Sequence, residues 1–223
     1  MAEFDKIYLA WRKGVGSRRH IVGLLEKQPD GNHTFQYLLE AKKLIFTEGF
    51  LPYFEFQDLN KVYDTNVVAI FAQRLMKPQR PDIRQFYEFW EVDQSQADDR
   101  FYLLGKTQGL VATDNFEFLA EYELTSQTHF LTDLAGLSHQ NLPRGTVKEG
   151  DSLRVELERE NEKDPEAVKV FAGELALGYI KKVHCRVFHQ DEADKLELTV
   201  KSVEQNGAIR KIYARVAHKD IDL

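Results

Sequence analysis

The strongest local constraint on the fold is the dipeptide Asn206-Gly207, which lies between two apolar runs. Both residues tolerate the positive φ angles of a two-residue turn, and such turns join neighbouring antiparallel strands. The run before the dipeptide alternates apolar with polar residues from Leu196 to Val200, and the run after it extends over 209–216. The sequence therefore predicts a β-hairpin near the end of the chain.

The second half of the chain continues the β pattern upstream of this hairpin. Apolar and charged residues alternate from Leu153 to Glu158, as in a strand with one buried and one solvated face. Two more strands are predicted at 167–171 and 175–180, on either side of Gly173, and a helix at 181–190. Several short strands with one helix favour a small barrel or a strongly bent sheet.

The first half mixes strands and helices. A strand is predicted at 7–11, and a hairpin joins 20–26 to 34–39, because the intervening Pro29-Asp30-Gly31-Asn32 has turn chemistry. The spacing of apolar residues predicts one helix that begins at Asp64 and runs through Met76, and a second that begins at Pro81. Strands are predicted again at 101–104 and 116–124.

Residues 121–128 show little periodicity, and the domain boundary is placed there. The predicted fold class is therefore α+β: a mixed α+β domain over residues 1–125, followed by a small β-barrel domain with one helix over residues 126–223.

Charge and cysteine content exclude several classes of protein. Acidic residues outnumber basic ones in both halves, and the chain as a whole has 30 Lys+Arg against 36 Asp+Glu. A protein that clamps duplex DNA along its backbone needs a basic excess, so any contact with nucleic acid must come from a local patch. One cysteine rules out an intramolecular disulfide and suits a reducing cytosol. No apolar run is long enough to span a bilayer and no secretory signal is recognisable, so we expect a soluble cytoplasmic protein without a membrane partner.

Three motifs resemble catalytic or cofactor sites but fail the chemistry. The segment 14–19 has two glycines and two arginines but is followed by a strand pattern rather than a helix, which favours a basic hairpin tip over a phosphate loop. His184 and His189 are five residues apart, so on a helix they would lie on different faces. A single cysteine, Cys185, cannot complete a zinc site with them. The segment 136–139 lacks the second glycine of a nucleophile elbow. We therefore expect no catalytic residues, no metal and no cofactor, and a protein that is not an enzyme.

The segment from Asn161 to Val170 is the most informative one. Asn161 and Asp164 are three residues apart and Pro165 follows, which describes a tight connection whose side chains bond the local backbone. A structural turn alone would account for these residues.

The order of motifs around this turn resembles the HIRAN domain. Leu157 and Asn161 are followed by Asp164, then by Ala167-Val168 and Val170, and later by the segment Gly178-Tyr179-Ile180-Lys181-Lys182. Upstream, Leu134-Ala135-Gly136-Leu137 is similar to the strand with which the family begins. The resemblance covers roughly residues 128–217.

This resemblance implies an OB-like β-barrel, of the kind fused to fork-remodelling helicases and found alone in bacteria. It implies recognition of the 3′-hydroxyl end of single-stranded DNA, or of damaged or stalled DNA, by Asn161 and Asp164, with Tyr179, Lys181 and Lys182 beside them. A carboxylate can accept a proton from a 3′-hydroxyl group, whereas it repels a 3′-phosphate.

The chain departs from the family at the residues that stack on bases. Where helicase members carry Arg-Tyr-Tyr, this sequence has Ser138, His139 and Gln140, of which only His139 can stack, and poorly. Base stacking is worth about 1–3 kcal/mol per base, so weak binding of DNA is expected.

Residues 5–120 are loosely similar to the N-terminal region of HipA-type toxin kinases. The likeness rests on the segments 22–26, 31–37 and 50–52. In that family the region is not catalytic, and no kinase activity follows from it.

The function expected from these observations is non-catalytic binding of single-stranded DNA ends. The alternative is a protein-interaction scaffold in a toxin or defence system that does not bind DNA. A helicase, a nuclease or a toxin component is the kind of protein partner that either function would have.

Overall fold

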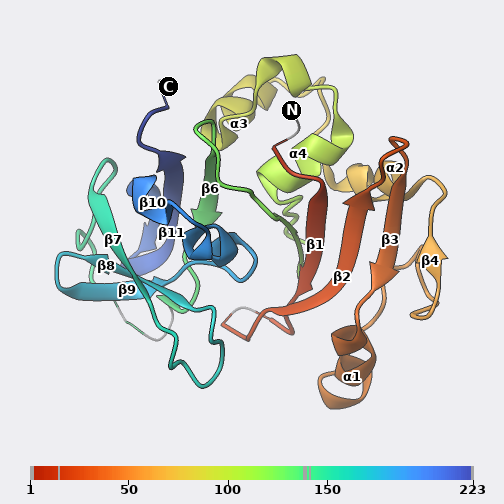
Figure 1. Ribbon diagram of the computed structural model, residues 1–223, viewed down its shortest axis with the longest axis horizontal. Coiled ribbons are helices and arrows are strands. Elements are labelled where there is room, and N and C mark those ends of the chain that lie inside the picture. Colours follow the sequence, from red (N-terminus) through yellow and green to blue (C-terminus); the bar gives the residue numbers. More distant parts are fainter. Residues whose placement is uncertain (1–2, 15, 138–139, 141, 222–223) are drawn as a thin grey trace. The chain divides into compact units, whose positions relative to one another are not determined.

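The computed structural model describes residues 3–14, 16–137, 140 and 142–221, which form two compact units (Figure 1). The first unit is Met1–Glu121 and the second is Tyr122–Leu223. The division falls at the edge of the segment 121–128, in which the sequence places the boundary between domains.

The first unit contains a five-stranded antiparallel sheet in the order β4-β3-β2-β1-β5. The turn between β2 and β3 has the expected chemistry, because Asp30 Oδ1 accepts from the backbone of Asn32 and Gly31 has a φ of +84°. The strand at 7–11 and the hairpin around this turn are thus confirmed. The strands are β1 (Lys6–Trp11), β2 (His20–Lys27), β3 (His33–Tyr37), β4 (Val62–Tyr63) and β5 (Phe116–Ala120).

The helices of the first unit agree with the sequence pattern only in part. The helix expected from Asp64 begins instead at Val67, with Asn66 before it, and continues as a 3₁₀ turn. The strand expected at 101–104 is wrong, because these residues belong to α4. One helix, α1, was not predicted. The helices are α1 (Leu39–Thr47), α2 (Val67–Phe71), η1 (Ala72–Arg74), α3 (Ile83–Trp90), η2 (Gln94–Gln96) and α4 (Arg100–Thr107).

Aromatic rings fill the core of the first unit. The ring of Phe71 in α2 lies 5.0 Å from Phe35 in β3, 5.0 Å from Phe56 and 4.9 Å from Phe118 in β5, measured between centroids. All four side chains are buried. Tilted and edge-to-face contacts of this kind favour aromatic pairs beyond the area they bury, so these rings join α2 to the sheet.

The second unit is a sheet in the order β6-β11-β10-β7-β8-β9. The predicted hairpin at Asn206-Gly207 is confirmed: Asn206 pairs with Ala208, and Gly207 has a φ of +74°. The helix expected at 181–190 is shorter and of a different kind, a 3₁₀ helix, η4. The elements are β6 (His129–Asp133), β7 (Ser152–Leu157), β8 (Val168–Ala172), β9 (Leu175–Tyr179), η4 (His184–His189), η5 (Ala193–Lys195), β10 (Leu196–Asn206) and β11 (Ala208–His218).

The two ends of this sheet are joined by a backbone bridge, so the sheet curls into a barrel-like form. Ala135, just after β6, donates its N–H to the carbonyl of Tyr179 at 2.8 Å and accepts from the N–H of Tyr179 at 2.9 Å. Gly178 permits this approach, because a Cβ atom there would lie 2.3 Å from the carbonyl oxygen of Ala135. The glycine before Tyr179 therefore has a structural role at the seam of the barrel.

Among the described residues, no helix combines the length and the apolar character required to cross a membrane.

Candidate nucleic-acid interface

Asn161 and Asp164 lie in the connection from β7 to β8, in a turn that their own side chains hold. Asn161 Oδ1 accepts from the backbone N–H groups of Lys163 at 2.9 Å and Asp164 at 3.1 Å. Asp164 Oδ1 accepts from the N–H of Glu166 at 3.1 Å, and the Asp164 carbonyl accepts from Ala167. The local bonding expected of a structural turn is therefore present. We call residues 161–164 the Asn161–Asp164 turn.

Glu158, at the end of β7, connects this turn to the neighbouring strands. Its carboxylate accepts from Asn161 Nδ2 at 2.6 Å, from Tyr179 Oη at 3.0 Å and from Lys169 Nζ at 3.1 Å. Hydrogen bonds from Asn161, Lys169 and Tyr179 hold the pKa of the Glu158 carboxyl below its ordinary value. Burial and the adjacent carboxylate raise the pKa of Tyr179. The network fixes the orientation of Asn161 and of the Tyr179 hydroxyl group.

Asp164 and Lys182 form the polar pair at the edge of the turn. Asp164 Oδ2 lies 3.8 Å from Lys182 Nζ, and the two side chains are 24% and 36% exposed. Asp164 Oδ1 bonds the backbone, so Oδ2 is the oxygen that faces the lysine. The pair thus presents an acceptor for a hydroxyl group and a cation for a phosphate group within one small area.

Lys181 differs from the expectation. Its side chain is fully buried and forms an ion pair with Asp133 of β6, so in this geometry it is not available to a phosphate group. Asp133 is buried as well, and a charge removed from water requires such a partner. Of the two adjacent lysines, Lys182 is the one that reaches the Asn161–Asp164 turn.

Two further site residues were expected from the sequence, Tyr179 and His139. Tyr179 is half-buried and joins the turn through Glu158. His139, and Ser138 before it, lie outside the described residues. The structure thus brings Asn161, Asp164, Tyr179 and Lys182 together.

Two residues of this cluster were not predicted: Glu158 and Lys169. One local signal for Glu158 exists in the sequence, since it lies three residues before Asn161, within reach of a side-chain bond across a turn. Lys169 is brought to Glu158 by the pairing of β7 with β8, which sequence spacing does not reveal.

The histidines and the cysteine after β9 do not form a reactive site. Cys185 is buried and free, and burial, with the charge of Asp164 as a smaller cause, raises the pKa of its thiol to about 12. His184 is also buried, and its Nδ1 is 2.9 Å from Thr132 Oγ1. His189 contacts the carbonyl of Glu166 at 3.0 Å. No group of three or more possible metal ligands occurs among the described residues.

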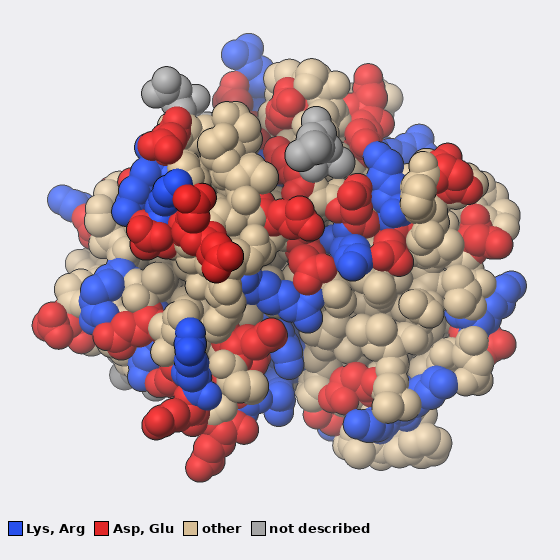
Figure 2. All heavy atoms as spheres, in the orientation of Figure 1, with Lys and Arg blue, Asp and Glu red and all other residues tan. Residues whose placement is uncertain are grey.

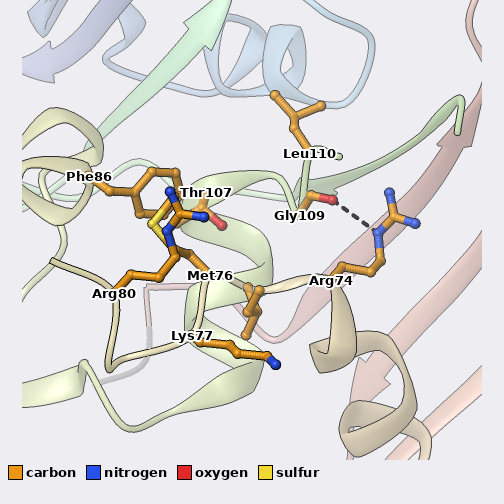
Figure 3. Close-up of a pocket in the computed structure, with 9 residues that line it drawn as sticks. Arg74, Met76, Lys77, Arg80, Phe86, Thr107, Gly109 and Leu110 are labelled. Atoms are coloured by element: carbon orange, nitrogen blue, oxygen red, sulfur yellow. Dashed lines mark hydrogen bonds between the residues drawn. The ribbon is translucent and has the colours of Figure 1, made fainter. Parts of the chain in front are cut away.

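Over most of the face drawn in Figure 2, Lys and Arg are interspersed with Asp and Glu. A hollow of about 430 Å³ in the first unit is lined by Arg74, Lys77 and Arg80 together with Phe86 (Figure 3). Arg74 donates to the carbonyl of Gly109 and pairs with Asp114, and Arg80 pairs with Asp82. Two of its three cations are therefore neutralised by carboxylates.

The family model that matches this chain covers residues of the second unit. Residues 127–211 match the family model of the HIRAN domain, which confirms that resemblance and the OB-like barrel expected from it. HIRAN domains are nucleic-acid-binding modules. The chain is similar in structure to the HIRAN domain of human HLTF, with 17% identity, a TM-score of 0.33, and coverage of 41% of this chain and 77% of that one. It is also similar to a structural-genomics protein from Lactobacillus plantarum, with 20% identity, a TM-score of 0.29, and coverage of 40% and 92%. A search of curated proteins finds no significant match.

Proposed function

We propose that the second unit binds the 3′-hydroxyl end of single-stranded DNA at the Asn161–Asp164 turn. The observation that carries this proposal is the Asp164–Lys182 pair, which combines a hydroxyl acceptor and a cation 3.8 Å apart at the surface. The match of residues 127–211 to a nucleic-acid-binding family supports DNA as the ligand class.

The chemistry of end recognition follows from these two side chains. Asp164 Oδ2 would accept the hydrogen of the terminal 3′-hydroxyl group, a charge-assisted bond stronger than one between neutral partners. A terminal 3′-phosphate would place negative charge against the same carboxylate and be disfavoured. Lys182 would turn from Asp164 to the nearest phosphate of the backbone. Because Lys181 is buried, it adds no phosphate contact here, and the salt dependence of binding should be weaker than two adjacent accessible lysines would give.

The test compares matched oligonucleotides that end in a 3′-hydroxyl or a 3′-phosphate, at low salt. The wild-type protein should prefer the 3′-hydroxyl end. Asp164→Ala should abolish this preference, because the acceptor and the repulsive charge are both lost. Lys182→Ala should weaken both oligonucleotides alike and lower the salt slope by about one.

Matched controls are available in the same unit. Asp191 and Lys148 are exposed and lie outside the turn, so Asp191→Ala and Lys148→Ala should leave both affinities unchanged. If the wild-type protein binds neither oligonucleotide at low salt, or if Asp164→Ala keeps the full preference, end recognition is wrong.

The proposed role is binding without catalysis. The buried thiol of Cys185, with its raised pKa, is a poor nucleophile, which supports this proposal.

A protein-interaction scaffold is the second candidate, and one observation favours it. In the first unit the side chains of Phe46 and Phe54 are 89% and 86% exposed, an unusual position for large aromatic residues. Absence of DNA binding by the wild-type protein would make this candidate the better one.

A further inference from the structure

The outer face of β7, β8 and β9 carries a row of alternating cations and rings. Strand register places Arg154 opposite Phe171 and Lys169 opposite Tyr179. Side chains of directly paired residues lie on the same face of a sheet. The residues that alternate with them along β7 and β8 are buried and face the other way: Leu153, Val168 and Val170.

Contacts within the row show that its members touch in sequence. The Arg154 guanidinium carbon lies 4.4 Å from the centroid of the Phe171 ring. Lys169 Nζ lies 5.8 Å from the Phe171 centroid and 5.9 Å from the Tyr179 centroid. Lys169 and Tyr179 both bond Glu158, which also holds Asn161. The row is therefore continuous with the Asn161–Asp164 turn.

Charge on this face is balanced, which limits what it can bind by electrostatics. Arg154 Nη1 donates to Glu156 Oε1 at 2.6 Å, and Lys169 is paired with Glu158. Two neutralised cations give little attraction for phosphate groups. The Arg154 side chain is 46% exposed and Phe171 is half-buried, so a planar surface made of guanidinium and ring remains accessible.

We propose that Phe171 and Arg154 form a stacking platform for a base of single-stranded DNA, at least two nucleotides upstream of the terminal nucleotide held at the Asn161–Asp164 turn. The inference rests on the function proposed above and extends it from the end of the strand to the nucleotides before it. Unpaired bases stack on aromatic rings and on guanidinium planes whatever their identity. The ligand class is thus single-stranded DNA longer than a dinucleotide, because bases within a duplex do not expose their faces.

The platform also explains how a chain with Ser138, His139 and Gln140 at the family's stacking positions can hold bases. Stacking would move to a different strand pair of the same barrel, on a surface whose charges are already balanced.

The test measures the affinity of an oligonucleotide of about ten nucleotides, within the range of site sizes of OB folds, and of a dinucleotide, both with a 3′-hydroxyl end. Phe171→Leu, which keeps apolar volume but removes the ring, should weaken the longer oligonucleotide about 5- to 150-fold. The dinucleotide affinity and the preference for a 3′-hydroxyl end should stay as in the wild type. Arg154→Gln should also weaken binding of the longer oligonucleotide.

Direct evidence of stacking comes from 2-aminopurine placed at successive positions of the longer oligonucleotide. Its fluorescence should be quenched at an internal position on the wild-type protein, and the quenching should be lost with Phe171→Leu. The matched controls are Phe46→Leu in the first unit and Arg210→Gln in β11, both exposed and outside the row. Neither should change affinity.

The outcomes separate the two proposals. If Phe171→Leu and Arg154→Gln bind the longer oligonucleotide as the wild type does, while the 3′-hydroxyl preference persists, the platform is wrong and end recognition stands. If the wild type has no end preference but Phe171→Leu still loses affinity, the platform stands and end recognition is wrong. If the wild type binds neither the longer oligonucleotide nor the dinucleotide, both proposals are wrong.

Discussion

At the scale of single residues, Glu158 is the centre of the candidate site, and its ionisation should matter for stability. Asn161, Lys169 and Tyr179 lower the pKa of its carboxyl below the ordinary value. A carboxyl whose pKa is lower in the folded than in the unfolded chain stabilises the fold above its unfolded pKa. That contribution is lost as the pH falls through the folded pKa.

Glu158→Gln should therefore lower the free energy of unfolding at neutral pH, by at most about 1 kcal/mol for a partly exposed pair. The difference from wild type should shrink at an acidic pH well below 4.5, the ordinary pKa of a glutamate, because the wild-type carboxyl takes up a proton as the pH falls. Urea unfolding at neutral pH and at the acidic pH measures the difference in the free energy of unfolding between variant and wild type. Glu160→Gln, an exposed neighbour, is the control. A deficit that is equal at both pH values would contradict the role given to the charge.

Lys181 shows why the site could be predicted only in part. Two sequence patterns, the spacing of Asn161 and Asp164 and the motif from Gly178 to Lys182, predicted four residues that the structure places together. These residues are Asn161, Asp164, Tyr179 and Lys182. Which of two adjacent lysines turns inward depends on Asp133, which lies in β6, far from Lys181 in the sequence. Such a tertiary partner leaves no trace in local spacing.

At the scale of elements, Gly178 is the point at which the barrel closes. A Cβ atom at this position would lie 2.3 Å from the carbonyl oxygen of Ala135, which is backbone and has little room to move. Gly178→Ala should therefore break the bridge between Ala135 and Tyr179 and destabilise the second unit by about 1–3 kcal/mol. Thermal unfolding of the variant measures the change.

The control for this substitution is Gly14→Ala. A Cβ atom at Gly14 meets no atom within 4 Å, and this glycine is not among those with positive φ. Equal melting temperatures for Gly178→Ala and wild type would refute the close approach at the seam.

The elements that sequence reasoning missed are those without a regular pattern of polarity. All residues of α4 from Phe101 to Thr107 are buried, so the helix shows no apolar stripe, and a short apolar run of this kind reads equally well as a strand. The deciding signal is Asp99, whose side chain accepts from the N–H groups of Phe101 and Tyr102. Strands with one solvated face and a clear turn, such as the Asn206-Gly207 hairpin, were predicted correctly.

At the scale of the whole molecule, Gln190 bonds the backbone of the segment with which the second unit begins. Gln190 Oε1 accepts from the N–H of Leu124 at 2.7 Å, and its Nε2 donates to the carbonyl of Tyr122 at 3.0 Å.

Limited proteolysis should cut first within 121–130 or in the exposed polar segment 93–100. An initial cut within 153–180 would count against two separately folded units.

Gln190→Ala should accelerate cleavage within 121–130 about five-fold or more, because two backbone groups lose their partner. Cleavage within 93–100 should be unchanged, which provides an internal reference. Gln205→Ala, in the exposed part of the last hairpin, is the control. Unchanged cleavage at 121–130 would show that Gln190 does not limit the opening of this segment.

The pairing of β6 with β11 also bears on how the second unit is made. Asp133, near the beginning of the second unit, pairs with Tyr213, near the end of that unit. A nascent chain that leaves the ribosome therefore exposes β6 long before its partner strand has been synthesised, and the unit cannot fold stepwise from its first strand. Contacts of such high sequence separation slow folding towards the millisecond-to-second range typical of β-barrels. The hairpin of β10 and β11, whose contacts are local, is the part best able to form first and to serve as the template on which β6 is added.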